Sequence, residues 1–328
     1  MDKLISRFPD QLVEALEIGE KARINLHTHK IHKVYVAGLG GSGIGGDFVK
    51  GFVRDECSVP YIVGKGYTIP QFVDAYTLAI CSSYSGNTEE TLASFYQMVE
   101  TEAKIVVIAS GGKLIEEAKE RGLDYIQVPG GWPSPRACLG YSIVQQLYIL
   151  HKLGFISDSF KSEIRSASDL IKYDTEAIKE AAKKVADRIH DKVPIIYSTD
   201  RIEAVAVRLR QQINENAKML CWHHVVPEMN HNELVGWTEK HADKAVIYLR
   251  NKDDYKRNQV RIDINQKIIA KYTDTIIDIF SKGNTLIEKS IYFVHLGDWV
   301  SWYLSEIRGV DAIEIGVIDF LKSELAKV

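Results

Sequence analysis

Short apolar segments alternate with helix-forming stretches along this chain, and this alternation restricts its fold more than any other feature. In the first half the apolar segments lie at residues 33–37, 61–63, 77–81, 104–109 and 124–128. Helical patterns separate them, most clearly at 89–102, and an amphipathic helix is expected before the first segment. Apolar strands that alternate with helices are typical of a parallel sheet covered by helices on both faces.

The second half repeats this organisation after a stretch without strand candidates. Residues 157–191 are rich in Lys, Glu, Asp and Ala at helical spacing, which predicts a helical connector. Apolar segments then follow at 193–198, 245–249 and 275–279, with long helices expected at 202–219 and 286–308. We therefore predict an α/β protein with two doubly wound parallel-sheet lobes. The expected boundaries are 1–155 for the N-terminal lobe with its opening helix, 156–190 for the helical connector, and 191–328 for the C-terminal lobe with its terminal helix.

The composition disfavours several classes of function. The 328 residues carry 41 Lys and Arg against 44 Asp and Glu, and a net charge of −3 gives no basic field for nucleic acid. No apolar run approaches the roughly 20 residues that span a bilayer, so no membrane partner is expected. The start of the chain lacks the basic residues and apolar centre of a signal peptide. The four cysteines have no C-x-x-C spacing, so we expect no zinc site, no disulfide framework and a cytoplasmic location.

A glycine-rich segment directly follows the first apolar segment. Its Gly38, Gly40 and Gly43 match the G-x-G-x-x-G dinucleotide fingerprint, but that fingerprint also needs a carboxylate at the end of the second strand. The second apolar segment is followed instead by Lys65, which disfavours a dinucleotide. So many glycines favour close backbone approach to a small ligand or a neighbouring helix, and a tight turn without a ligand is the alternative. The next helix is expected to begin near Asp47.

Hydroxyl side chains gather where the third apolar segment meets the following helix. Ser82, Ser83, Ser85 and Thr88 lie close together, and Gly86 lets the backbone approach a ligand. A helix N-terminus supplies free N–H groups and a dipole that favour phosphate. N-capping, the alternative explanation, needs only one hydroxyl. The loop therefore predicts a phosphate site, and because it has no lysine and no Walker pattern, triphosphate chemistry is disfavoured.

This loop, preceded by the Gly-Gly-Ser-Gly turn at 40–43, resembles the phosphate loop of the sugar isomerase (SIS) domain. Other segments resemble the bifunctional phosphoglucose/phosphomannose isomerases: Trp-Pro-Ser-Pro-Arg at 132–136, Ile-Asn-Glu-Asn-Ala-Lys at 213–218, Pro-Glu-Met-Asn-His-Asn-Glu at 227–233, and the tail at 308–311 with Lys322. The resemblance implies two SIS-type, flavodoxin-like lobes and reversible conversion of glucose 6-phosphate or mannose 6-phosphate into fructose 6-phosphate through an enediolate. It also implies a homodimer with active sites at the subunit interface, and neither a metal nor a cofactor.

The resemblance assigns residues to each chemical task. Glu215 matches the family's base, since one carboxylate held near C1 and C2 can carry the proton between them. His231 matches the ring-opening histidine, which in the family enters the site of the other subunit, and histidine titrates near neutrality. Arg136 matches the group that stabilises negative charge on the C1 and C2 oxygens, and Lys322 matches the family's lysine near the ring oxygen. The phosphate contacts carry over to Ser42, Ser82, Ser83, Ser85 and Thr88, and further substrate contacts to Gly41 and Gly43.

Each assignment has a simpler alternative. Without the family resemblance, Glu215 would be read as an ordinary exposed helical carboxylate, and Arg136 as an arginine that faces the phosphate or the surface. Side chains nearby in sequence offer the same chemistry: His223 and His224 in place of His231, Glu228 and Glu233 as carboxylates that orient His231, and Lys327 in place of Lys322.

One segment departs from the family's pattern. After Arg-Gly-Val the family often has Asp-Pro-Thr-Pro, whereas this chain has Asp311-Ala312-Ile313-Glu314. In the family a threonine hydroxyl in that tail is associated with accepting mannose 6-phosphate. The departure therefore bears on the second activity and leaves the fold and the base unaffected.

Two other classes of function remain as alternatives. A non-catalytic sugar-phosphate sensor with SIS lobes is expected to carry a DNA-binding helical module, and the residues before Lys33 have no basic cluster of that kind. An amino-sugar enzyme that hydrolyses glutamine needs an N-terminal cysteine, and here Asp2 follows Met1. Direct deamination or isomerisation of an amino-sugar phosphate stays open.

Overall fold

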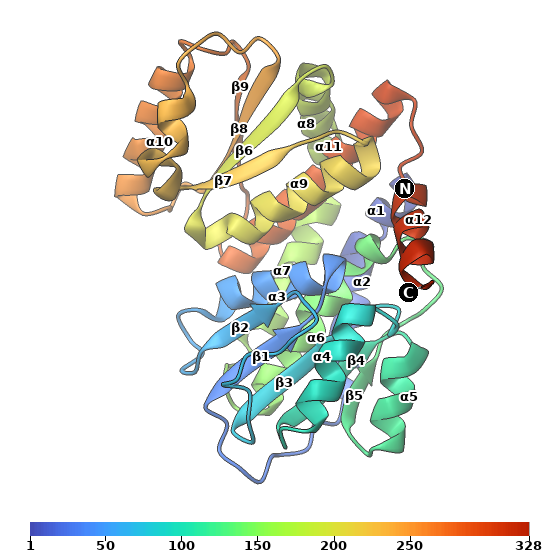
Figure 1. Cartoon of the computed structure of the whole chain (residues 1–328). Coiled ribbons are helices and arrows are strands. Elements are labelled where there is room, and N and C mark those ends of the chain that lie inside the picture. Colours follow the sequence, from blue (N-terminus) through green and yellow to red (C-terminus); the bar gives the residue numbers. More distant parts are fainter. Residues whose placement is uncertain (328) are drawn as a thin grey trace. The chain divides into compact units, whose positions relative to one another are not determined.

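The computed structural model describes residues 1–327 and divides the chain into two compact units. The N-terminal unit comprises residues 6–172 and 284–288, and the C-terminal unit comprises residues 1–5, 173–283 and those from 289 onward. Each unit is built on a parallel β-sheet with helices packed against it (Figure 1). The α/β fold class predicted from the sequence is therefore confirmed.

The N-terminal unit contains one sheet and the helices that surround it. In chain order its elements are α2 (Phe8–Lys21), β1 (Lys33–Ala37), α3 (Gly40–Val53), β2 (Tyr61–Gly64), β3 (Thr77–Ser82), α4 (Glu89–Val99), β4 (Lys104–Ala109), α5 (Gly112–Glu120), β5 (Asp124–Gln127), the short 3₁₀ helix η1 (Pro135–Cys138), α6 (Leu139–Lys152) and α7 (Ser159–Tyr173). All five predicted strands of this half are present.

The strand order of this sheet is β2-β1-β3-β4-β5, which is the flavodoxin-like order. Every pair is parallel, and the register sets Ala37 opposite Cys81 and Ser82 opposite Ile108. The carboxyl ends of β1, β3 and β4 therefore lie at one edge of the sheet. Ligands of doubly wound folds bind at this edge, next to the point where the strand order reverses.

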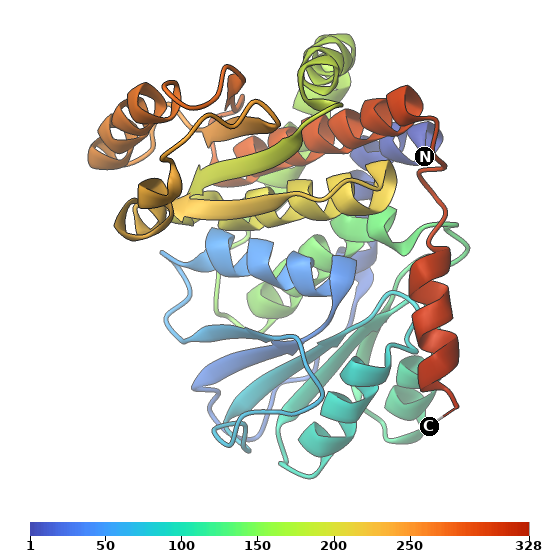
Figure 2. The ribbon, with the colours of Figure 1, turned by 45° about the horizontal axis from the view of Figure 1, so that its top comes forward.

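Successive residues along each strand point to opposite faces of the sheet, and different helices cover the two faces. Odd-numbered strand residues such as Ala79 and Val107 belong to a buried core with Phe95 and Met98 of α4 and Leu114 of α5. On the other face α3 and α6 pack, and α6 is buried along most of its length. Figure 2 shows α4 and α5 together on their side of the sheet. Burying each large side chain of this kind contributes about 1.5–3 kcal/mol, so both faces hold the sheet in place.

The helix after β1 corrects one prediction. It was expected to begin near Asp47, but α3 begins at Gly40 and takes in most of the glycine-rich segment. A Cβ at Gly45 would lie 2.2 Å from Ser142 Oγ of α6, and one at Gly43 would lie 2.4 Å from the Gly38 carbonyl oxygen. The glycines therefore serve close packing of a helix against its neighbours, although glycine has poor helix propensity.

The C-terminal unit repeats the same layout with one strand fewer. Its elements are α1 (Asp2–Ser6), α8 (Thr175–Ile189), β6 (Val193–Thr199), η2 (Asp200–Ile202), α9 (Glu203–Ala217), β7 (Trp222–Val226), η3 (Glu228–His231), η4 (Glu233–Gly236), β8 (Lys244–Arg250), α10 (Lys256–Ile269), β9 (Ile276–Phe280), α11 (Leu286–Arg308) and α12 (Gly316–Leu325). The parallel order is β7-β6-β8-β9. β6, β8, β9, α9 and α11 match the predicted segments closely, whereas β7 was not predicted.

The stretch predicted as a connector, residues 156–190, contains two helices. It forms α7 and α8, and the division between the two units falls at Lys172 and Tyr173, near the end of α7. Across residues 1–327, no helix combines the length and the apolar character needed to cross a membrane.

Candidate functional site

The serine-rich loop of the N-terminal unit is held together by its own hydroxyls. Ser83 Oγ lies 2.8 Å from Thr88 Oγ1 and accepts a hydrogen bond from the Gly86 N–H at 3.2 Å. Thr88 is the N-cap residue of α4, yet its side chain does not cap the helix. N-capping, the simpler explanation for these hydroxyls, is therefore not how they are used. The first turn of α4 is left without a side-chain cap, which is the condition for anion binding at a helix N-terminus.

Backbone conformation in this loop requires glycine. Gly86 has a φ of +72°, and a Cβ there would lie 1.9 Å from the Gly111 carbonyl oxygen. Asn87 Oδ1 accepts from the Lys113 N–H at 2.9 Å, which braces the loop against the start of α5. The loop is thus fixed by its neighbours before any ligand binds.

Ser42 brings the start of α3 to the same loop. Its Oγ accepts from the Tyr84 N–H at 3.2 Å. Ser85 is exposed, and its Oγ accepts from the Asn87 N–H at 3.2 Å. Ser82 differs, since it ends β3, is 1% exposed and has its Oγ 3.4 Å from Ser142 Oγ of α6. The Ser82 hydroxyl therefore lies on the α6 face of the sheet.

Arg136 lies next to the glycine-rich start of α3. It is part of η1, is 6% exposed, and its Cα would be 3.6 Å from a Cβ at Gly41. A buried guanidinium costs free energy unless it is paired, which argues against an ordinary surface arginine. The structure thus gathers the residues predicted for this half of the site: Gly41, Ser42, Gly43, Ser83, Ser85, Thr88 and Arg136.

Tyr84 has no role in the predictions from sequence, yet it links two parts of this site. Its phenol donates to the Pro129 carbonyl at 3.1 Å and accepts from the Trp132 N–H at 3.2 Å. Ser110 Oγ donates to the Tyr84 carbonyl at 2.7 Å. Burial raises the pKa of Tyr84 to about 12, so the phenol stays protonated. In the sequence, the position of Tyr84 between Ser83 and Ser85 is the feature that could have indicated its part in the site.

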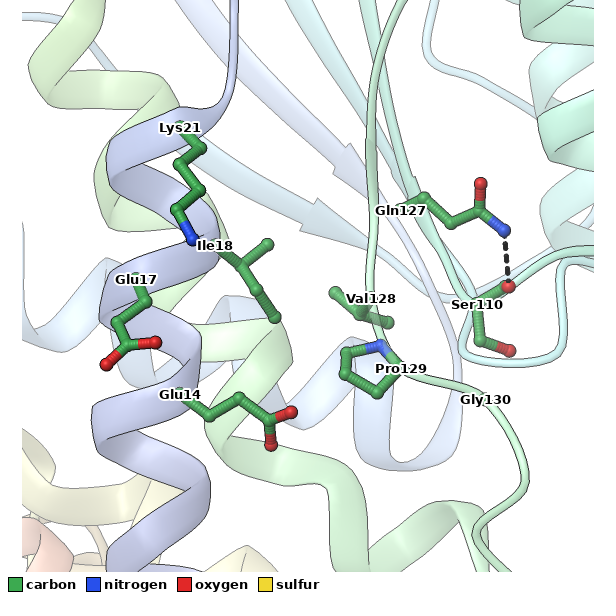
Figure 3. Close-up of a pocket in the computed structure, with 9 residues that line it drawn as sticks. All are labelled: Glu14, Glu17, Ile18, Lys21, Ser110, Gln127, Val128, Pro129 and Gly130. Carbon is green, nitrogen blue, oxygen red and sulfur yellow. Dashed lines mark hydrogen bonds between the residues drawn. The ribbon is translucent and has the colours of Figure 1, made fainter.

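A cavity of about 560 Å³ lies beside this region, at the carboxyl ends of β4 and β5 (Figure 3). Glu14, Glu17 and Lys21 of α2 line one side, and Ser110 and the backbone of 127–130 line the other. None of the residues predicted for the site lines it. Its connection to the phosphate loop runs through Ser110, which bonds to Tyr84.

In the C-terminal unit, Glu215 lies in the last turn of α9 and is half-buried. One face of α9 is bonded to α11: Arg208 Nη2 to Asp298 Oδ1 at 3.2 Å, Gln212 Nε2 to Asp298 Oδ1 at 2.8 Å and Asn216 Nδ2 to Ser301 Oγ at 2.9 Å. Figure 2 shows the two helices side by side. These buried polar bonds hold α9 along its length. They therefore also hold the backbone position from which the Glu215 side chain extends.

The histidines near β7 differ in environment. His223 and His224 are strand residues, and His224 Nδ1 accepts from the Val225 N–H at 2.8 Å. His231 ends η3 and is exposed, and within residues 1–327 its side chain makes no hydrogen bond or ion pair. The exposed position suits a group that acts on a molecule outside this chain.

The two carboxylates that were alternatives for orienting His231 bond elsewhere. Glu228 Oε1 accepts from Asn232 Nδ2 at 2.9 Å. Glu233 Oε1 accepts from the Tyr197 phenol and from Trp222 Nε1 at 3.3 Å. Burial raises the pKa of Tyr197, with the nearby Glu233 charge adding to the effect, so this phenol is a permanent donor.

Lys322 lies on α12 and is exposed. Its competitor Lys327 pairs with Glu324 at 2.5 Å, which occupies that ammonium in a local ion pair. Within residues 1–327, no group of three or more His, Cys, Asp or Glu side chains is arranged to hold a metal ion. The predicted residues thus fall into two sets, one in each unit, with Glu215, His231 and Lys322 in the second.

Comparison with known proteins gives consistent matches. A family model described as the bacterial phospho-glucose isomerase C-terminal SIS domain matches residues 178–325. The chain is 38% identical to the bifunctional phosphoglucose/phosphomannose isomerase of Caldicellulosiruptor bescii, over 100% of this chain and 99% of that protein. It is also 38% identical to the enzyme of the same name from Aquifex aeolicus, over 90% of each. Among solved structures, a Clostridium difficile protein described as a phosphosugar isomerase has a TM-score of 0.76 at 16% identity, covering 95% of this chain and 94% of that one.

Proposed function

The chain belongs to the bifunctional phosphoglucose/phosphomannose isomerase family, and on that basis we propose that it interconverts fructose 6-phosphate with glucose 6-phosphate and mannose 6-phosphate. The observation that carries this conclusion is the similarity along the whole chain to enzymes of that name. The uncapped N-terminus of α4, surrounded by serine and threonine hydroxyls, supports it independently, since a sugar phosphate needs such an anchor.

Phosphate binding is assigned to the N-terminal unit. The donors are the free N–H groups of the first turn of α4 with the hydroxyls of Ser42, Ser83, Ser85 and Thr88, and Ser82 supports the loop from the α6 side. Gly41 and Gly43 allow the backbone to approach the substrate closely. Binding the phosphate at C6 limits the positions that C1 and C2 can take relative to the catalytic groups. This raises their effective concentration near those groups and lowers the activation barrier of the proton transfer.

Proton transfer is assigned to Glu215. An ionised carboxylate takes the C2 proton of the open-chain aldose and returns it to C1 of the enediolate, which gives the ketose, and the reverse sequence regenerates the aldose. C2 becomes planar in the enediolate, so return of the proton to either face of C2 links both epimeric aldoses to one ketose. A single base serves both activities when the enediolate turns about the C2–C3 bond and presents its other face to the same carboxylate.

Ring opening and charge stabilisation need further groups. His231 takes the proton of the anomeric hydroxyl, and Lys322 donates toward the ring oxygen as the ring opens. Arg136 stabilises the negative charge that develops on the C1 and C2 oxygens, which is the larger electrostatic contribution in reactions of this kind. Its burial supports this role, because a guanidinium with little water around it interacts more strongly with an oxyanion.

We further propose a homodimer in which His231 enters the site of the partner subunit. Its exposure supports this, as do the exposed apolar side chains of α12: Val317, Phe320, Leu321 and Leu325. Mixing the inactive variants Glu215→Gln and His231→Ala tests it. If each site takes Glu215 from one subunit and His231 from the other, one of the two sites of a hybrid dimer has both wild-type residues. Activity should therefore return when the two variants exchange subunits. No recovery would place both residues in a site of one subunit.

A cytoplasmic location is also proposed. None of the four cysteines, Cys57, Cys81, Cys138 and Cys221, forms a disulfide in the described residues, and cysteines outside disulfides suit a reducing compartment. Cell fractionation tests this, and recovery of the chain outside the cytoplasmic fraction would contradict it.

A coupled assay tests the proposed function. Formation of fructose 6-phosphate is measured from glucose 6-phosphate and from mannose 6-phosphate in parallel, each with and without a chelator. We expect turnover of both sugars and no effect of the chelator. Turnover of neither sugar would refute the isomerase function, turnover of glucose 6-phosphate alone would refute the second activity, and loss on chelation would refute a metal-free mechanism.

A further inference from the structure

Lys218 lies directly beyond the helix that carries Glu215, in a conformation unusual for lysine. It is the C-cap residue of α9, with a φ of +55° and a ψ of +39°. Glycine or asparagine adopts this left-handed conformation more readily than a lysine does. A lysine that persists there must be held by other contacts.

The ammonium group of Lys218 is surrounded by backbone carbonyls. Nζ donates to the Glu215 carbonyl at 2.7 Å, the Asp311 carbonyl at 2.7 Å and the Glu314 carbonyl at 2.8 Å. An ammonium has three N–H donors, so these three contacts use all of them. The Glu215 carbonyl belongs to the last turn of α9, where carbonyls lack helical partners and a positive charge is favourable.

The contacts of Lys218 join two stretches of the C-terminal unit. One is the end of α9, which other bonds attach to α11: Arg308 Nε donates to the Ala217 carbonyl at 3.0 Å. The other is the segment 311–314, which leads into α12 and Lys322. This is also the segment that departs from the family's Asp-Pro-Thr-Pro pattern.

We infer that Lys218 is a positioning residue for the isomerase reaction, which fixes the carboxylate of Glu215 by bonding the end of α9 to segment 311–314. This inference rests on the proposed function. Lys218 does not act on the substrate itself, because its three donors are directed at carbonyl oxygens. Loss of the ammonium removes the bonds between the last turn of α9 and segment 311–314, which shifts the carboxylate even though α9 stays attached to α11. The phosphate loop of the N-terminal unit is unchanged.

Two variants separate the ammonium from the backbone conformation. Lys218→Gly and Lys218→Asn both tolerate positive φ and both lack the ammonium, whereas Lys218→Arg keeps a cationic donor. Lys192→Asn is the matched control, because Lys192 Nζ also donates to a backbone carbonyl, that of Ala242 at 2.7 Å, and this bond involves neither α9 nor segment 311–314. Activity is expressed per folded molecule, from circular dichroism and the thermal midpoint of each variant.

We expect Lys218→Gly and Lys218→Asn to lower kcat by about 10- to 100-fold, since small displacements of a catalytic group have effects of this size. KM and inhibition by inorganic phosphate should stay within about twofold of wild type, because phosphate binding is retained. In D2O the fraction of product molecules that carry deuterium from the solvent should differ between these two variants and wild type. The reason is that a displaced Glu215 carboxylate exchanges the transferred proton with solvent to a different extent before returning it to the sugar. Lys218→Arg should recover part of kcat, and Lys192→Asn should equal wild type.

Other outcomes contradict the inference in distinct ways. A kcat of Lys218→Asn within about twofold of wild type would overturn it. A rise in KM and in the phosphate inhibition constant, with kcat unchanged, would also overturn it. An inactive wild-type protein in the same assay would refute the proposed function instead, and is thus distinguished from failure of the inference.

Discussion

Ser83 and Thr88 show how single hydroxyls can prepare a site. The two side chains bond to each other at 2.8 Å and leave the first turn of α4 uncapped. Residue types and spacing are enough to predict such a loop from the sequence. They do not show which hydroxyl faces the ligand: Ser82 lies on the α6 face because strand residues alternate, and that depends on the exact end of β3.

His295 is a buried base whose protonation affects stability. It lies on α11, is 1% exposed, and its Nε2 accepts from Trp299 Nε1 at 3.2 Å. Burial lowers its pKa to about 3, whereas the unfolded chain protonates it near pH 6.5. The unfolded state therefore binds the proton more readily than the folded state. The contribution of His295 to the free energy of unfolding is fully present above pH 6.5 and is lost as the pH falls toward 3, by about 1.4 kcal/mol per pH unit.

We predict that His295→Gln removes this part of the pH dependence. Glutamine can still accept from Trp299 but does not titrate. Between pH 7.5 and 5.0 the loss in free energy of unfolding should be smaller in the variant by about 2 kcal/mol, measured by urea denaturation. His190→Gln, which removes a histidine near the surface, serves as the control. Equal losses in wild type and His295→Gln would show that His295 does not couple folding to protonation.

Elements were predicted well where apolar periodicity was strong. The strands at 33–37, 104–109 and 193–199 and the helix at 286–308 agree with the sequence pattern. β7 (Trp222–Val226) was missed, because its two histidines interrupt the apolar run and its side chains are only partly buried. The start of α3 was missed since its glycines are favoured by close packing with α6, a tertiary contact that propensity does not include.

Tyr84 connects the phosphate loop to the segment that leads into η1 and Arg136. We predict that Tyr84→Phe loosens this segment, because the Pro129 carbonyl and the Trp132 N–H lose their shared partner. Stability should fall by about 1 kcal/mol, and amide hydrogen exchange should increase at 129–136. Tyr173→Phe, at a residue 91% exposed, is the matched control. Unchanged exchange at Trp132 would contradict this linking role.

At the scale of the whole molecule, the two lobes share the order of four strands but differ in their chemistry. The loop after β8 corresponds in topology to the phosphate loop after β3, yet it carries Asp253 and Asp254. Asp253 pairs with Lys289 at 2.6 Å, and burial raises the pKa of Asp254, which accepts from Thr199 Oγ1 at 3.2 Å. Carboxylates at this position disfavour an anion, so the two lobes share a fold but not phosphate binding.

The sequence predicts this doubled architecture and the two sets of site residues, because both depend on local patterns and on family resemblance. It does not predict the links between distant segments. The three carbonyls around Lys218 come from residues 215, 311 and 314, and only the folded chain brings them together. Contacts of this kind determine how firmly a predicted residue is held.

The central claim is that this chain is an aldose–ketose isomerase with Glu215 as its base. The most direct measurement follows fructose 6-phosphate by NMR in D2O with wild type, Glu215→Gln and Glu215→Asp. For wild type we predict isomerisation with deuterium uptake at C1 of fructose 6-phosphate and at C2 of the aldose products. Glu215→Asp should show weak activity. The rate of Glu215→Gln should be lower by about 10²–10⁴-fold, with inhibition by inorganic phosphate retained. Isomerisation and exchange by Glu215→Gln at the wild-type rate would contradict the account.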